Sequence, residues 1–277
     1  MSASLTDPPF QPVESILSEI AVDAGQAGEL KSQRVVAAFE RQILSGRLAS
    51  GTRLPTEGEL CELLGVSRSV IRDSIRTLMA RGLVTVRQGR GTTVAEPSDT
   101  AYSNAMLVLL TRSGMTMGDV FNARATIDIS LVALAAKNGT ADDWDALDEA
   151  YKRFADAVAR DDEEAATLWH ARFHMGILTA VHQPALTLML RPMTDLTVVS
   201  GTASVRRTLG GDWEVEGHAP ILAALKAGDP DKATAAMVAH YEVATRPEPY
   251  QTFMDRLFAD AYFNDEVGVG VDSRNWL

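Results

Sequence analysis

Four of the five histidines in this 277-residue chain have a spacing that would let them act together as metal ligands. His170 and His174 are four residues apart, so both project from one face if their stretch is helical. His218 and His240 lie in two later stretches, and neutral imidazole is the commonest protein ligand for transition metals. The four could close around one ion inside a helical bundle, or each could be an ordinary buried histidine. The spacing alone leaves both interpretations open.

Arg124 is the best candidate for an anion contact, because a buried guanidinium holds a carboxylate through two hydrogen bonds. Asp128 follows four residues later, so a structural ion pair between the two is an equally good interpretation. His182 stands directly before a Gln-Pro pair, which is typical of a helix end, and it is left outside the candidate cluster. Arg206 and Arg207 are expected near solvent.

Helices must position these residues, and the sequence has a helical pattern from Met117 to about Thr245. Apolar residues recur there every three or four positions, and no stretch alternates as a β-strand does. The predicted helices are Val120–Asn138, Ala141–Arg160, Glu163–Val181, Pro184–Val199, Gly217–Ala227 and Asp231–Ala244. We expect this part of the chain to form an all-α helical bundle.

The stretch Arg53–Ala95 predicts a different structure, a helix-turn-helix followed by a two-stranded wing. Thr56 is expected to cap a helix at Glu57–Leu64, and Ser67 a second helix at Arg68–Arg81. The wing strands are predicted at Leu83–Arg87 and Thr92–Ala95, and a helix that completes the core at Lys31–Ser45. The buried faces of the two motif helices are predicted to carry Leu60, Leu63 and Leu64, then Val70, Ile71, Ile75, Leu78 and Met79.

The fold class that follows is mainly α, with an N-terminal winged helix-turn-helix and a C-terminal helical bundle. The expected parts are an N-terminal arm (1–28), a winged helix-turn-helix domain (29–97), a linker helix region (98–117), an all-helical domain (118–246) and a C-terminal extension (247–277). The arm contains three prolines, and the extension is expected to pack on a partner subunit.

Charge is divided unevenly along the chain. From Leu30 to Ala95 there are eleven Lys and Arg against five Asp and Glu, a net charge of +6 in a chain whose total is −11. A basic module on an acidic body indicates that one part alone binds phosphate. Cys61 is the single cysteine, and neither a signal sequence nor a long apolar run occurs, so we expect a cytoplasmic protein without membrane contact.

The stretch Leu54–Val94 resembles the winged helix of GntR-type bacterial transcription regulators. The likeness lies in the Leu-Pro-x-Glu start, the Gly-Val-Ser-Arg turn, the arginine three residues after Ser69, and Gln-Gly-x-Gly in the wing. In that family the second helix enters the major groove of DNA. The resemblance implies DNA contacts from Ser67, Arg68, Ser69, Arg72, Gln88 and Gly89. Gly58 stands where the family often has an arginine, so base reading is expected to depend more on Arg68 and Arg72.

The helical part resembles the all-helical FCD effector domain of FadR-like GntR regulators. The likeness lies in the stretches FNARATIDISLVALAAKNGT, HARFHMGIL and EGHAPILAALKAGDPDKATAAMVAHYE. Metal-binding members have an Asp and a His four residues apart, followed by two later His. His174, His218 and His240 match those histidines, and His170 stands where the Asp is usual. The resemblance therefore implies a metal site at these four residues.

A site of three or four neutral imidazoles favours Zn²⁺ or Ni²⁺ over Mg²⁺ or Ca²⁺, which prefer oxygen ligands. Histidine in place of Asp removes one negative charge, so the bound ion would keep more positive charge to attract an anion. The expected effector is a small carboxylate, with Arg124 as a further contact.

Together these features predict a ligand-responsive transcription regulator that binds an inverted-repeat operator in double-stranded DNA as a homodimer. It is not expected to be an enzyme, because no general-base or nucleophile motif accompanies the histidines. Two alternatives are a metalloenzyme that uses the four-His site and a DNA binder whose effector pocket is degenerate.

Overall fold

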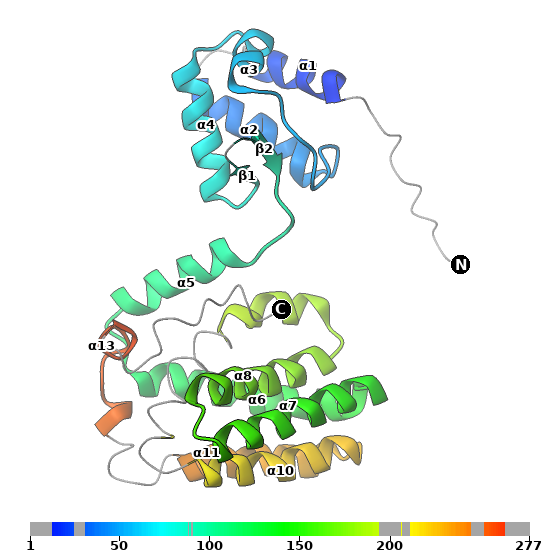
Figure 1. Ribbon diagram of the computed structural model, residues 1–277, viewed down its shortest axis with the longest axis vertical. Helices are drawn as coiled ribbons and strands as arrows, with labels where there is room; N and C mark the ends of the chain where they lie inside the picture. The colour runs from blue at the N-terminus through cyan, green and yellow to red at the C-terminus, as the bar shows by residue number, and fades with distance from the viewer. Residues whose placement is uncertain are drawn as a thin grey trace. The chain divides into compact units, whose positions relative to one another are not determined.

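A computed structural model describes residues 13–24, 31–87, 89, 91–193, 206, 211–244 and 252–263 of the chain. The chain divides into two compact units, one ending at Ala101 and the other starting at Tyr102. The fold is mainly helical, as the sequence predicted, with a small two-stranded sheet in the first unit (Figure 1).

The first unit is a helical core that carries a β-hairpin. Its elements are α1 (Val13–Ala24), α2 (Lys31–Leu44), α3 (Glu57–Leu64), α4 (Arg68–Ala80), β1 (Val84–Arg87) and β2 (Gly91–Val94). All six contribute apolar side chains to one core, in which Phe39, Leu60 and Leu78 are at most 1% exposed. Burial of this shared face, rather than the propensity of any one helix, holds the unit together.

Helices α3 and α4 form the predicted helix-turn-helix. Thr56 caps α3 through a capping box, in which its hydroxyl accepts from the backbone N–H of Glu59 and the Glu59 carboxylate accepts from the backbone N–H of Thr56. Gly65 ends α3 with a left-handed φ of 63°. The hydroxyl of Ser67 then accepts from the backbone N–H of Val70 and starts α4. These local contacts fix the direction in which α4 leaves the turn.

The wing is an antiparallel hairpin attached to the core at one end. Val84 pairs with Val94, and Arg87 pairs with Gly91. Both valines are 2% exposed, whereas the rest of β1 is exposed. The hairpin is therefore held at Val84 and Val94 and presents its other end to solvent.

The prediction of buried faces is wrong for two residues. Leu63 is 49% exposed and Met79 is 44% exposed. Each lies at the edge of its helix, where Leu60 or Leu78 already fills the position toward the core. A short helix presents a narrow stripe to its neighbours, so apolar residues beside that stripe remain at the surface.

The N-terminal arm predicted for residues 1–28 contains a packed helix, α1. Its side chains Ile16, Leu17 and Ile20 are at most 2% exposed and lie in the core formed with α2 and α3. Arg47 donates from its Nη2 to Oε1 of Glu19 at 2.7 Å and joins the helix to the loop after α2. Residues 13–24 therefore belong to the first compact unit.

The second unit is a bundle of helices. Its named elements are α5 (Thr100–Arg112, which begins at the unit boundary), α6 (Met117–Asn138), α7 (Ala141–Ala159), α8 (Glu163–Ala180), α10 (Asp212–Lys226), α11 (Pro230–Ala244) and α13 (Phe258–Phe263). Residues 184–193 are also helical. Helix α8 packs on α6 and α7, while α10 and α11 pack on each other and on α6 (Figure 1). Thr116 and Thr140 start α6 and α7 with capping boxes, so these two ends are fixed locally.

The C-terminal extension packs on its own chain through residues 252–263. Phe253 and Phe258 are 7% and 0% exposed and lie in one cluster with Met117 and Val120 at the start of α6. The backbone N–H of Phe258 donates to the carbonyl of Met115 at 2.9 Å. This segment covers apolar side chains of α6 that the bundle helices leave open.

Within the described part of the chain, no helix combines the length and the apolar character that a membrane crossing requires.

Candidate metal centre and nucleic-acid interface

Helix α8 supplies two of the four candidate histidines. The carboxylate of Asp162 caps the helix by accepting from the backbone N–H of Ala165. His170 and His174 lie one turn apart and are each 3% exposed, because their side of α8 faces the other helices of the bundle. The ring of Phe154 on α7 lies against His170, with 5.3 Å between the centroids.

The structure brings all four predicted histidines together. His218 comes from α10 and His240 from α11, and one nitrogen from each of the four rings lies within 4.8 Å of the others. His218 is fully buried and His240 is 9% exposed. A group of nitrogens this close, drawn from three helices, has the size of a metal coordination shell.

One nitrogen of each ring lies close to nitrogens of the other three. Nε2 of His218 lies 3.2 Å from Nε2 of His174, and Nδ1 of His218 is 2.5 Å from the backbone carbonyl of Glu214. Because that carbonyl can only accept, Nδ1 of His218 carries the proton and Nε2 has a free lone pair. Among the residues that the structure describes, neither ring nitrogen of His170 has a hydrogen-bond partner, nor does Nδ1 of His240, and all three are buried. Buried polar atoms usually have partners, so these nitrogens are available as ligands.

Burial keeps the cluster neutral. Desolvation lowers the pKa of His170, His174 and His240 well below the usual value of 6.5, and the nearby histidines and Arg124 lower it further. For His218 desolvation lowers the pKa to about 4. Neutral imidazole is the form that binds a metal, so the four residues are held ready to coordinate.

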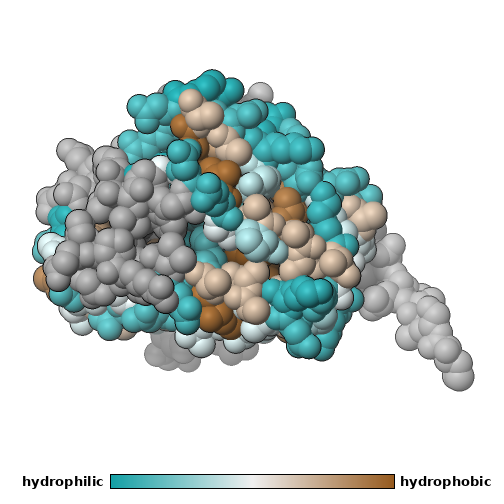
Figure 2. All heavy atoms as spheres, turned by 90° about the horizontal axis from the view of Figure 1, so that it is seen from below, coloured by the Kyte–Doolittle hydropathy of each residue, from teal (hydrophilic) through white to brown (hydrophobic). Residues whose placement is uncertain are grey.

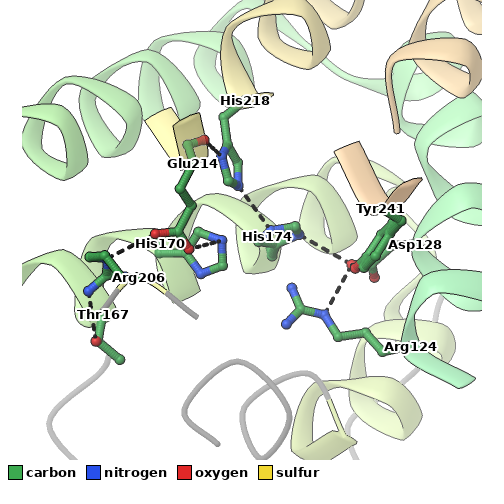
Figure 3. A network of polar contacts seen from close by, with 9 residues as sticks. All are labelled: Arg124, Asp128, Thr167, His170, His174, Arg206, Glu214, His218 and Tyr241. Carbon is green, nitrogen blue, oxygen red and sulfur yellow. Dashed lines mark hydrogen bonds and ion pairs between the residues drawn. The ribbon is translucent and has the colours of Figure 1, made fainter. Parts of the chain in front are cut away.

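One side of the cluster is formed by Asp128 of α6. Its Oδ2 accepts from the hydroxyl of Tyr241 at 2.5 Å and from Nε of Arg124 at 3.2 Å (Figure 3). The same oxygen lies 3.2 Å from Nδ1 of His174, although that nitrogen lacks the alignment of a hydrogen bond. The Arg124–Asp128 ion pair, one of the two interpretations of Arg124 from the sequence, is therefore present.

Glu214 of α10 stands on another side of the cluster. Its Oε1 is 3.5 Å from Nε2 of His170, and its Oε2 accepts from Nε of Arg206 at 2.9 Å (Figure 3). Arg206 also donates to the hydroxyl of Thr167 at 3.4 Å. The side chains of Glu214 and Arg206 are only 4% and 9% exposed. Burial raises the pKa of Glu214, and Arg206 opposes this rise.

The predicted DNA-contacting residues lie at the start of α4. Ser67, Arg68, Ser69 and Arg72 are all exposed there. Nε of Arg72 donates to Oε2 of Glu57 on α3 at 2.8 Å. Arg72 is therefore paired within the helix-turn-helix, at the surface, where a DNA contact would have to replace Glu57.

Of the two predicted DNA-contacting residues in the wing, the structure describes Gly89. Gly89 is exposed in the hairpin turn with a φ of 75°, a conformation that favours glycine. Gln88 lies outside the described residues.

Comparison with known proteins gives two family matches, one in each compact unit. Residues 31–94 match the family model for bacterial regulatory proteins of the gntR family, and residues 119–243 match the FCD domain. The Glc operon transcriptional activator of Escherichia coli (strain K12) is 33% identical over 175 residues, which are 62% of this chain and 68% of that protein.

This chain belongs to the GntR family.

Other GntR-family proteins agree with this assignment. The galactonate operon transcriptional repressor of Escherichia coli (strain K12) is 25% identical over 227 residues, 78% of this chain and 96% of that protein. A solved structure, Streptococcus agalactiae GntR, matches with a TM-score of 0.61 and 25% identity over 78% of this chain and 99% of that one. This GntR-family chain is therefore a DNA-binding transcription regulator with an FCD domain, and it is not an enzyme.

The sequence missed the polar groups around the histidines of the FCD domain. The prediction that Arg206 lies near solvent is wrong, because its side chain is buried against Glu214. Glu214 and Tyr241 were not considered, although Glu214 lies four residues before His218 on the same helix. That spacing is the one signal that would have found Glu214. His182, which the prediction left out, lies outside the cluster, with Nε2 2.7 Å from Asp143.

Proposed function

We propose that this GntR-family regulator binds an inverted-repeat operator as a homodimer and releases or engages it in response to a small carboxylate. The carboxylate would bind beside a transition-metal ion held by His170, His174, His218 and His240. Effector binding would change the spacing of the two DNA-binding domains of the dimer and thereby their fit to the two half-sites.

The observation that carries the metal proposal is the 3.2 Å approach of Nε2 of His174 to Nε2 of His218. Two nitrogens bound to a tetrahedral ion at about 2.0–2.1 Å are about 3.3 Å apart, so the observed separation fits two ligands of one ion. Further ligands would come from the buried nitrogens of His170 and His240 that have no hydrogen-bond partner in the described part of the chain. Four imidazoles favour Zn²⁺ or Ni²⁺ over Mg²⁺ and Ca²⁺.

A cation in this site would attract an anion, and Arg124 is the proposed second contact. The guanidinium is 3% exposed and adjoins Asp128 beside His174. Relatives are named for a galactonate operon and an L-lactate dehydrogenase operon, and galactonate and lactate are both hydroxycarboxylates. This supports a small carboxylate as the effector class.

The proposed DNA contacts are Ser67, Arg68, Ser69 and Arg72 on α4, with Gln88 and Gly89 in the wing. The exposure of the four α4 residues supports this assignment, as does the start of α4 at Ser67. Side chains at the beginning of a recognition helix are the ones that reach base edges in the major groove.

The homodimer is proposed from apolar surface on the second unit. Figure 2 shows a band of apolar side chains between hydrophilic ones on one face of the molecule. Large apolar residues are also exposed on α5 and on helical residues 184–193, among them Leu109 at 70% and Leu188 at 63%. Surface of this kind commonly marks a protein interface.

A thermal-shift screen of small organic acids, on protein with and without its metal removed by a chelator, tests this function. A true effector raises the melting temperature by mass action, and it should do so only when metal is present. The same acid should then change the affinity for operator DNA. If the acid still stabilises the protein after metal removal, it does not bind at the metal. If it leaves the affinity for operator DNA unchanged, it is not the effector. Light scattering at the mass of one chain would reject the homodimer.

A further inference from the structure

Both histidines of α8 have a carboxylate beside them, and each carboxylate is held by an arginine. Asp128 lies 3.2 Å from His174 and accepts from Arg124. Glu214 lies 3.5 Å from His170 and pairs with Arg206 through its other oxygen (Figure 3). The two arrangements come from different helices, because Asp128 is on α6 and Glu214 is on α10.

We propose that Glu214 is a positioning residue of the metal site, which holds His170 for coordination and places a negative charge beside the bound cation. The inference rests on the proposed metal site and adds a residue to it. The competing interpretation is that Glu214 and Arg206 form a buried ion pair that only stabilises the fold.

Glu214 reaches two of the four histidines from one position. Its side-chain Oε1 is 3.5 Å from Nε2 of His170, and its backbone carbonyl is 2.5 Å from Nδ1 of His218 one turn later. The carbonyl selects the form of His218 whose Nε2 is free to coordinate. The carboxylate lies against a ring that has no hydrogen-bond partner of its own among the described residues. A substitution of the Glu214 side chain keeps the backbone contact with His218 and therefore acts on His170 of α8.

The burial of the pair argues for a role toward the cation. Taking a carboxylate and a guanidinium out of water is costly, and apolar replacements are often equally stable. Glu214 nevertheless sits in the bundle with 4% of its side chain exposed, directed at a ligand rather than at the surface. Removing an acidic partner that orients a metal-binding histidine typically weakens metal affinity by about 10- to 100-fold.

The test compares Zn²⁺ and Ni²⁺ affinity, measured by competition with a chromophoric chelator, in the wild type and in Glu214→Gln. We expect Glu214→Gln to weaken binding by about 10- to 100-fold. Glu214→Asp, which keeps the carboxylate, should recover part of the loss. Glu149→Gln removes an exposed carboxylate on α7 and serves as the control, with unchanged affinity expected.

The variant Arg206→Met distinguishes a role of Glu214 toward the cation from a purely structural ion pair. If Glu214 serves the cation, Arg206→Met leaves the carboxylate in place, so metal affinity stays equal or rises while Glu214→Gln lowers it. If the pair is only structural, both variants lose thermal stability without metal and keep the wild-type affinity. That second result would overturn the proposal.

A double variant guards against misfolding. Glu214→Gln combined with Arg206→Met removes both buried charges, which is tolerated better than leaving one of them unpaired. It should show the same weakened affinity as Glu214→Gln alone, and wild-type affinity in the double variant would reject the proposal. Absence of metal binding by the wild type would instead reject the metal site itself, so the two failures are distinguishable.

Discussion

Nε2 of His174 lies 3.2 Å from Nε2 of His218, although the two residues are 44 positions apart in the sequence. The proton of His218 is on the opposite nitrogen, which faces the carbonyl of Glu214. Its Nε2 lone pair therefore points at His174, which can either donate its own Nε2–H to that lone pair or share a bound cation with it. Burial lowers the pKa of both rings and keeps them neutral, the form in which a metal could replace the proton between the two nitrogens.

We predict that the second unit is stabilised by Zn²⁺ or Ni²⁺ through these histidines. At a free metal concentration of 100 times Kd, the free energy of unfolding should rise by about 2.7 kcal/mol. All four tryptophans lie after Ala101, so tryptophan fluorescence during denaturant unfolding reports this unit alone. His218→Ala should abolish the metal-dependent part of the stability.

His182→Asn provides the matched control for the metal experiment. His182 is on the same unit, with 46% of its side chain exposed, and it lies outside the cluster. Its left-handed backbone conformation, with a φ of 53°, is one that asparagine also adopts readily. Equal metal stabilisation of His218→Ala and His182→Asn would show that the cluster is not the site.

We also predict that acid destabilises the metal-free second unit over a defined pH range. Burial lowers the pKa of the four clustered histidines below 6.5, and that of His218 to about 4. Between these pH values the unfolded chain binds more protons than the folded one, so the free energy of unfolding falls as the pH falls. Each histidine contributes a slope of up to about 1.4 kcal/mol per pH unit. The unfolding free energy, measured with denaturant at a series of pH values, should depend less steeply on pH in His218→Gln than in the wild type. Above pH about 7 the two proteins should show the same pH dependence.

The helices that begin with local signals were the ones predicted best from the sequence. Thr56 and Ser67 cap their helices as predicted, and Thr140 caps the helix that was predicted to start at Ala141. Such a cap is a contact between positions three residues apart, so the local sequence is enough to find it. Helix α10 was predicted to begin at Gly217 but begins at Asp212. The N-cap residue before it, Gly211, makes no side-chain hydrogen bond to the helix, so no local signal marks the start.

The candidate site was predictable only in part for the same reason. The spacing of His170 and His174 places both on one helix face whatever the tertiary structure. The positions of Asp128 and Glu214 beside them depend on how α6 and α10 pack against α8, which no local pattern specifies. The burial of Arg206 likewise follows from its pairing with Glu214 and not from its own sequence context.

The C-terminal segment should matter for the stability of the second unit. Phe258 is fully buried against Met117 and Val120, so Phe258→Ala should reduce the free energy of unfolding by about 3–5 kcal/mol. Leu257→Ala, one residue earlier and 45% exposed, is the control and should cost well under half of that. Denaturant unfolding followed by tryptophan fluorescence measures both, and similar losses would mean that this segment is not anchored by Phe258.

Arg72 is predicted to read a base edge when the regulator binds its operator. Its guanidinium projects from the exposed side of α4, and Glu57 holds it at 2.8 Å, so DNA must displace one exposed ion pair that contributes little energy. Arg72→Ala should weaken operator binding by about 1–3 kcal/mol, the range of a good bidentate base contact. Arg76→Ala on the same helix removes an arginine whose side chain is 78% exposed, and it should affect operator and random DNA alike. The operator, first selected from random duplexes, is titrated against a random duplex at fixed salt. If Arg72→Ala lowers affinity for both DNAs equally, as expected for Arg76→Ala, then Arg72 contacts phosphate and the reading of the sequence must come from other residues at the start of α4, such as Arg68.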